Sequence, residues 1–211
     1  MRLLAGTLAL IARLVCGGVV YWTSGVPRSG QRVFIVNHTS NLDFLLLWSY
    51  LPPDLRANTR PVAAEDYWGT GIRRFFAHRV FNAVLVMRGK LAVNPKDTPD
   101  PTLGKQGVER MLEGLADGSS LIIFPEGTRG PGDRVAEFRS GLYHLCNSRP
   151  GLELVPVYMH NLNRIMPKGE VLPVPMMARI IVGAPLQLAP DEPKDAFLQR
   201  ARGALQELAE L

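Results

Sequence analysis

The chain has 211 residues, of which 46% are hydrophobic and 20% are charged. This length and apolar content suffice to bury the core of one domain. The two cysteines, Cys16 and Cys146, lie far apart and match no metal-ligand or redox spacing, so the sequence suggests neither a disulfide framework nor a zinc site. A net charge of +5 fits nucleic acid, an anionic membrane surface or phosphorylated substrates, and composition alone does not choose among them.

The amino-terminal segment is apolar and purely cationic, because no Asp or Glu precedes Asp43. Such a segment suits an anionic membrane surface. The apolar run from residue 3 to residue 22 is just long enough to span a bilayer, but Arg13 lies at its centre. We therefore expect residues 1–29 to form an embedded or interfacial anchor before a domain at residues 30–211. The alternatives are a buried amino-terminal helix and a cleaved signal peptide, which the central arginine disfavours.

Short runs rich in Val and Ile alternate with helical patterns along the rest of the chain. Strands are predicted at Arg32–Val36, Ala83–Met87, Ser120–Phe124, Leu152–Tyr158 and Ala178–Val182. Helices are predicted at Asp43–Tyr50, Gly71–Phe81, Leu103–Ala116, Arg139–Ser148 and Pro193–Leu208. This alternation indicates an α/β fold, in which a single domain has a largely parallel sheet flanked by helices and follows an apolar, membrane-associating helix.

The helix predicted at residues 71–81 carries apolar residues on one face and basic residues on the rest. The apolar face consists of Ile72, Phe75, Phe76 and Val80. Such a helix either lies on a membrane surface or packs on the core with a solvated basic face, and the sequence favours neither interpretation.

The first candidate site lies where a predicted strand runs into a predicted helix. Residues 33–43 read VFIVNHTSNLD, which places His38 just past the carboxyl end of the strand, where α/β sheets bind ligands. A turn through Ser40 and Asn41 would bring the Asp43 carboxylate to His38. Asp43 would then fix the His38 tautomer and leave the other ring nitrogen as a general base. The alternative is a capping box, in which Ser40 caps the helix and Asp43 follows three residues later.

A second strand-to-turn segment, residues 121–130, reads LIIFPEGTRG. Gly127 lets the backbone approach a ligand closely, and Thr128 offers a hydroxyl. Arg129 is able to hold a phosphate through two parallel hydrogen bonds, so the composition indicates a phosphate site. Taken alone, the segment is more typical of a Pro-Glu-Gly surface turn with a solvated arginine.

NHTSNLD and FPEGTRG, in this order and at this separation, resemble two motifs of the glycerolipid acyltransferase family, whose members include lysophosphatidic acid acyltransferases. Residues 83–88, AVLVMR, resemble the second motif of that family. Residues 154–158, LVPVY, resemble the fourth, whose Pro156 helps to shape the acyl-donor region. The resemblance covers roughly residues 30 to 190.

The resemblance implies a role for each matching residue. It makes His38 the general base and Asp43 the residue that orients it. Binding of the acceptor phosphate falls to Arg88 and to the third-motif residues Glu126, Gly127, Thr128 and Arg129. Family members often carry an acidic residue just before the arginine of the second motif, where this chain has Met87.

We therefore expect a membrane-associated acyltransferase that moves a fatty acyl group from acyl-coenzyme A or an acyl carrier protein to the hydroxyl of a lysophospholipid. The leading acceptor is 1-acyl-glycerol-3-phosphate, which would give phosphatidic acid. No cofactor or nucleic acid is expected. No metal is expected either, since the remaining histidines show no ligand spacing. The expected location is the cell membrane, by a peripheral or single anchor, with the catalytic domain on the cytoplasmic side. The alternatives are another lysolipid head group and a non-catalytic, basic lipid-binding protein.

Overall fold

The computed structural model describes residues 2–26, 30–87, 101–130, 132, 134–166, 172, 174 and 176–211. Within these residues one seven-stranded sheet has the order β1-β7-β6-β2-β5-β3-β4. The strands are β1 Gly18–Trp22, β2 Arg32–Val36, β3 Thr59–Ala64, β4 Val84–Val86, β5 Ser120–Ile123, β6 Glu153–His160 and β7 Ala178–Val182. The described strand pairs are parallel except for β6 with β7, so the predicted largely parallel sheet is confirmed.

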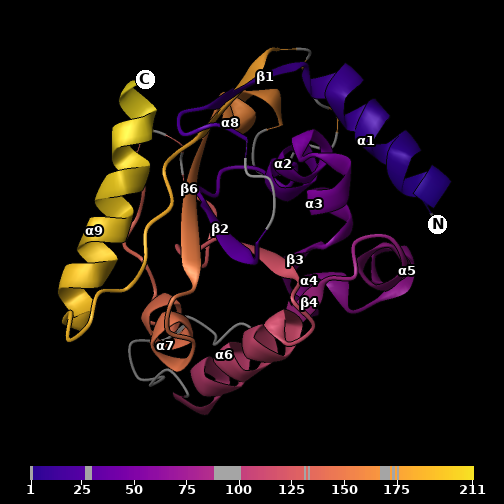
Figure 1. The fold of residues 1–211 in the computed structure, drawn as a ribbon. Coiled ribbons are helices and arrows are strands. Elements are labelled where there is room, and N and C mark those ends of the chain that lie inside the picture. The colour runs from indigo at the N-terminus through magenta and orange to yellow at the C-terminus, as the bar shows by residue number, and fades with distance from the viewer. Residues whose placement is uncertain are drawn as a thin grey trace, which may run out of the picture.

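Helices cover both faces of this sheet (Figure 1). They are α1 Arg2–Cys16, α2 Asp43–Tyr50, α3 Pro53–Ala57, α4 Glu65–Trp68, α5 Gly71–Arg79, α6 Pro101–Leu115, α7 Gly141–Ser148, α8 Leu162–Ile165 and α9 Lys194–Glu207, followed by a 3-10 turn at Leu208–Glu210. Side chains alternate between the faces of a strand. In β2, Val33 and Ile35 join the core beneath α6, α7 and α9. Phe34 and Val36 join the core beneath α1 and α2.

The sheet places three loops along one edge. Strands β6, β2 and β5 lie side by side and run in the same direction. The residues that follow them therefore meet at the carboxyl edge of the sheet, where α/β folds bind ligands. His38 follows β2, Glu126 follows β5, and Asn161 follows β6.

The amino-terminal segment differs from the expected continuous apolar helix. Helix α1 ends at Cys16, and Gly17 has φ 48° and donates its N–H to the carbonyl of Arg13 at 3.0 Å. A glycine in this left-handed conformation ends a helix. Residues 18–22 then form β1, which pairs with β7 although it lies within the range expected to form the anchor. Among the residues described, no helix combines the length and apolar character needed to cross a bilayer.

Arg13, at the centre of the apolar run, contacts helix α2. Its guanidinium donates to the carbonyl oxygen of Ser49 and lies 4.9 Å from the centroid of the Tyr50 ring. Both partners belong to the last turn of α2, where carbonyls lack helical partners and the helix dipole is negative. Arg13 therefore fastens α1 to the carboxyl end of α2.

Helix α1 buries one face and leaves a second apolar face open. Ala9, Ala12 and Cys16 are buried. The open face consists of Leu3, Leu10, Ile11 and Leu14, of which Leu14 is 74% exposed. The helix thus packs on the domain through small residues and presents its larger apolar side chains outward.

We predict that Arg13→Ala lowers the free energy of unfolding by about 1–2 kcal/mol, because a hydrogen bond from a charged group to the end of α2 is lost. Leu14→Ala, one residue along the same helix, should change it by less than about 0.5 kcal/mol, because that side chain is exposed. Urea unfolding followed by circular dichroism measures both. Equal losses in the two variants would show that Arg13 does not fasten α1.

Candidate active site

His38 and Asp43 form a hydrogen-bonded pair. Residues 37–42 are not helical, and α2 begins at Asp43. This turn brings Nδ1 of His38 to 2.8 Å from Oδ2 of Asp43, so the predicted contact is confirmed. The Asp43 side chain is fully buried, whereas that of His38 is 23% exposed. A carboxylate only accepts hydrogen bonds, so Nδ1 of His38 is the donor in this contact.

The same carboxylate also organises the turn. Oδ2 of Asp43 accepts the backbone N–H groups of Thr39 at 2.7 Å and Ser40 at 2.9 Å. The second bond is one half of a capping box, although Ser40 itself does not cap the helix, whose first flanking residue is Leu42. The interpretation in which Ser40 caps the helix is therefore wrong, and the Asp43 carboxylate instead joins the turn to the imidazole.

Two neighbours hold His38 from other directions. The ring of Phe124 stacks on the imidazole with centroids 4.2 Å apart. The preceding residue, Asn37, exchanges two hydrogen bonds with the backbone of Met159 in β6, at 3.0 and 2.8 Å. The end of β2 is thus fixed to β6, and the imidazole has little freedom to rotate.

Glu126 is turned inward. Its Oε1 accepts the backbone N–H of His38 at 2.8 Å, and its Oε2 accepts that of Ala136 at 2.8 Å. The residue is 3% exposed, and burial raises the pKa of its carboxyl group, while the two backbone hydrogen bonds act in the opposite direction. Both oxygens are therefore engaged with the fold. The predicted contribution of Glu126 to acceptor binding stays a prediction.

The rest of this loop is open to solvent. Gly127 adopts φ 74°, and a Cβ atom there would lie 3.3 Å from the side chain of Arg139. Thr128 is exposed and Arg129 is half-buried. Within the described part of the chain, the Arg129 guanidinium has no ion pair or hydrogen bond, so it is available to an anion.

Arg139 was not singled out from the sequence. Its Nε donates to the carbonyl of Glu126 at 3.4 Å, and its backbone N–H donates to that of Pro125 at 2.8 Å. Arg139 lies outside the motifs described above, at the predicted start of a helix, so the sequence carries no signal that it contacts the Glu126 loop. Arg88, predicted to hold the acceptor, lies outside the described residues.

Comparisons with known proteins place the chain in a family. A family model described as Acyltransferase matches residues 19–160. A protein named Taffazin from Dictyostelium discoideum is 28% identical over 148 residues, which cover 68% of this chain and 49% of that protein. The protein named 1-acyl-sn-glycerol-3-phosphate acyltransferase LPAT1, chloroplastic, from Arabidopsis thaliana is 29% identical over 138 residues, which cover 65% of this chain and 34% of that protein. The chain thus spans about half or less of the length of these relatives.

A solved structure shares the fold. The crystal structure of the 1-acyl-sn-glycerophosphate acyltransferase PlsC from Thermotoga maritima matches 99% of this chain and 80% of that chain, with a TM-score of 0.74 and 18% sequence identity. At this identity the likeness concerns the fold alone.

Both thiols are predicted to be unreactive in the native protein. Cys16 and Cys146 are buried; burial raises the pKa of the Cys146 thiol to about 12 and also raises that of Cys16. At pH 8 both thiols are therefore mainly protonated. Titration with a chromogenic disulfide reagent should therefore detect no fast thiol in the native protein and two after unfolding. Fast labelling of Cys146 in the native protein would reopen its assignment as an inert, buried thiol.

Proposed function

Because the chain belongs to the acyltransferase family, we propose that it transfers a fatty acyl group from a thioester to the hydroxyl of a lysophospholipid, foremost 1-acyl-glycerol-3-phosphate. One observation carries the proposal. The His38 imidazole is bonded through Nδ1 to a buried carboxylate, and its other nitrogen is left as a base beside a loop whose Arg129 has no ion pair with any described residue.

In the proposed reaction, Nε2 of His38 accepts the proton of the acceptor hydroxyl while the oxygen attacks the thioester carbonyl carbon. The tetrahedral intermediate then expels the thiolate, and the imidazolium returns the proton to the sulfur. Asp43 stabilises the imidazolium between these steps, because its carboxylate accepts from Nδ1 throughout. The oxygen–carbon bond replaces the sulfur–carbon bond, and the products are an ester and a free thiol.

The acceptor chemistry fits the spacing of the two loops. In 1-acyl-glycerol-3-phosphate the free hydroxyl and the phosphate are on adjacent carbons, so the base and the phosphate site must be neighbours. Glu126 and Gly130, at either end of the Gly127–Arg129 loop, are each bonded to the backbone of His38 at 2.8 Å. In this proposal Arg129 grips the phosphate, with Gly127 and Thr128 as further contacts.

Two helices support a membrane-surface location. Helix α1 exposes Leu3, Leu10, Ile11 and Leu14, and α5 exposes Ile72 and Phe75 among basic side chains. Apolar side chains flanked by arginines suit an anionic lipid surface. The predicted apolar face of this helix therefore has two environments. Phe76 packs on the core, whereas Ile72 and Phe75 are exposed. The proposed location is the cytoplasmic side of the cell membrane.

We predict that His38→Ala abolishes acyl transfer, lowering kcat by at least about a hundredfold, because the general base is lost. His144→Ala, an exposed histidine on α7, should leave kcat within about twofold. Labelled acyl-coenzyme A and acyl carrier protein are each tested with a panel of lysophospholipids. Lipid binding without product from any pair would instead support the non-catalytic lipid-binding alternative.

For Arg129→Ala we predict an increase of about tenfold in the KM for the acceptor and little change in the KM for the donor, because a charge-assisted bond to phosphate is lost. Arg129→Lys should recover part of the loss, since it restores charge without the two parallel hydrogen bonds. Steady-state kinetics with each substrate varied in turn separates the effects. Equal damage to both constants would contradict a phosphate contact.

The contribution of α1 to membrane binding is tested by point substitutions, because deletion of residues 1–22 would also remove β1. We predict that Leu10→Gln with Leu14→Gln reduces co-sedimentation with vesicles of phosphatidylcholine and phosphatidylglycerol several-fold, since exposed apolar area is lost. Ile72→Gln with Phe75→Gln is the matched pair on α5. A larger loss in the α5 pair would assign the main membrane contact to that helix.

A further inference from the structure

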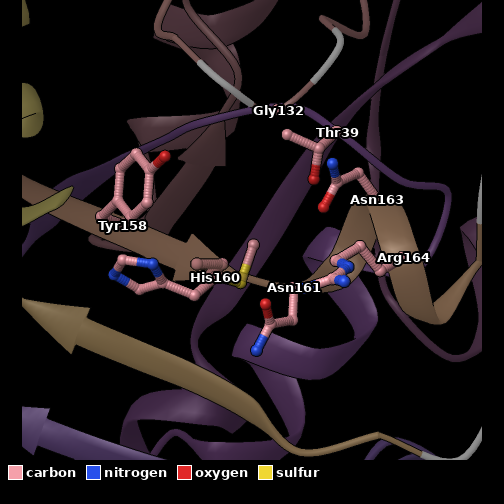
Figure 2. A pocket seen from close by; sticks show the side chains of 8 residues that line it. Thr39, Gly132, Tyr158, His160, Asn161, Asn163 and Arg164 are labelled. Carbon is pink, nitrogen blue, oxygen red and sulfur yellow. The ribbon is translucent and has the colours of Figure 1, made fainter.

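A cavity of about 290 Å³ is lined in part by Thr39, the residue that follows His38 in the sequence. It is bordered by the turn after β2, the loop after β5, the end of β6 and α8 (Figure 2). Its lining residues are Thr39, Gly132, Tyr158, Met159, His160, Asn161, Asn163 and Arg164. One water occupies about 30 Å³ in the liquid, so the cavity has room for a segment of a ligand.

The lining is polar and carries positive charge. Thr39 and Tyr158 contribute hydroxyl groups, and Asn161 and Asn163 contribute amides. None of the described lining residues is Asp or Glu, and Arg164 forms no ion pair with any described residue. Such a lining suits a ligand that combines an anionic group with amide or hydroxyl groups.

His160 adds no charge at neutral pH. Burial lowers the pKa of its imidazole, and the nearby Arg179 guanidinium lowers it further. The Nε2 atom of His160 lies 3.3 Å from a guanidinium nitrogen of Arg179, and it accepts a hydrogen bond from it as a neutral ring. The positive charge at the cavity therefore comes from Arg164.

The loop after β5 closes against α8 at a position where only glycine fits. Gly132 has φ 95°, and a Cβ atom there would lie 2.5 Å from Nδ2 of Asn163. On the other side, the hydroxyl of Ser40 donates to the carbonyl of Met166 at 3.0 Å, which ties the turn after β2 to the end of α8. The walls of the cavity are therefore joined by direct contacts.

The lining of the cavity includes both a buried and an exposed residue. Thr39, directly after His38, is buried, whereas Arg164 is exposed. Strand β2 lies between β6 and β5, and the cavity is bordered by residues that follow all three strands: Thr39 after β2, Gly132 after β5 and Asn161 after β6. An acyl transfer brings two substrates to one base. With the acceptor phosphate at Arg129, as in the proposed function, the cavity is left for the second substrate.

We infer that this cavity binds the phosphopantetheine arm of the acyl thioester donor. Arg164 holds the phosphate at the exposed end, and the hydroxyl and amide side chains bond the two amides of the arm nearer the thioester. Coenzyme A and acyl carrier protein carry the same arm, so the site serves either donor. This inference rests on the proposed function and specifies its donor site.

The test compares two donors that differ only in the phosphate, palmitoyl-4′-phosphopantetheine and palmitoyl-pantetheine. The unmodified protein should prefer the phosphorylated donor about tenfold in kcat/KM, because Arg164 gains a charge-assisted bond. Arg164→Ala should reduce this preference to within about twofold and leave the KM for the acceptor unchanged. Arg164→Lys should keep part of the preference, and Lys194→Ala, which removes a cation on α9, should keep all of it.

Two results would overturn the inference. One is an undiminished preference in Arg164→Ala, and the other is a raised KM for the acceptor, which would assign the cavity to the acceptor head group. Thermal unfolding checks that each variant is folded. Asn163→Ala gives an independent test, because it should weaken both donors equally.

Calorimetry separates this inference from the proposed function. If the unmodified protein makes no product, the proposed function fails, but binding of 4′-phosphopantetheine and pantetheine still tests the cavity. Tighter binding of the phosphorylated compound that is lost in Arg164→Ala supports the site, and equal binding of the two compounds refutes it.

Discussion

The backbone of His38 is bonded on both sides to the loop that follows β5. Its N–H donates to the Glu126 carboxylate and its carbonyl accepts from Gly130, each at 2.8 Å. Two segments 88 residues apart in sequence are thereby held as one unit. The arrangement requires two buried carboxylates, Asp43 and Glu126, and each accepts two backbone N–H groups that offset the cost of burial.

The sequence predicted those elements whose pattern is local. Strand β2 and helix α2 have the predicted bounds, since a buried apolar run and an apolar helix border a polar turn. Strand β1 was missed because it continues an apolar run, although Gly17 and Gly18 were a signal for the end of a helix. Strand β3 was missed because Pro61 and Arg60 are unusual within a strand that pairs on both sides.

The same distinction applies to the site. The His38–Asp43 contact and the open Gly127–Arg129 loop follow from residues close in sequence. The inward orientation of Glu126 does not, because its partners are His38 and Ala136, and the pairing of Asn37 with Met159 joins residues 122 positions apart. The cavity beside Arg164 depends on four separate segments, and no single motif encodes it.

Helix α2 connects the candidate base to the first helix of the chain. Asp43 stands at its first residue, and its last turn is held by Arg13 of α1. Eight residues at 1.5 Å each give a rod about 12 Å long. In the proposed membrane-surface location, the length of this rod would contribute to the distance between the imidazole and the lipid. A lysolipid would then react while its hydrocarbon tail stays in the bilayer, provided that its hydroxyl reaches across that distance.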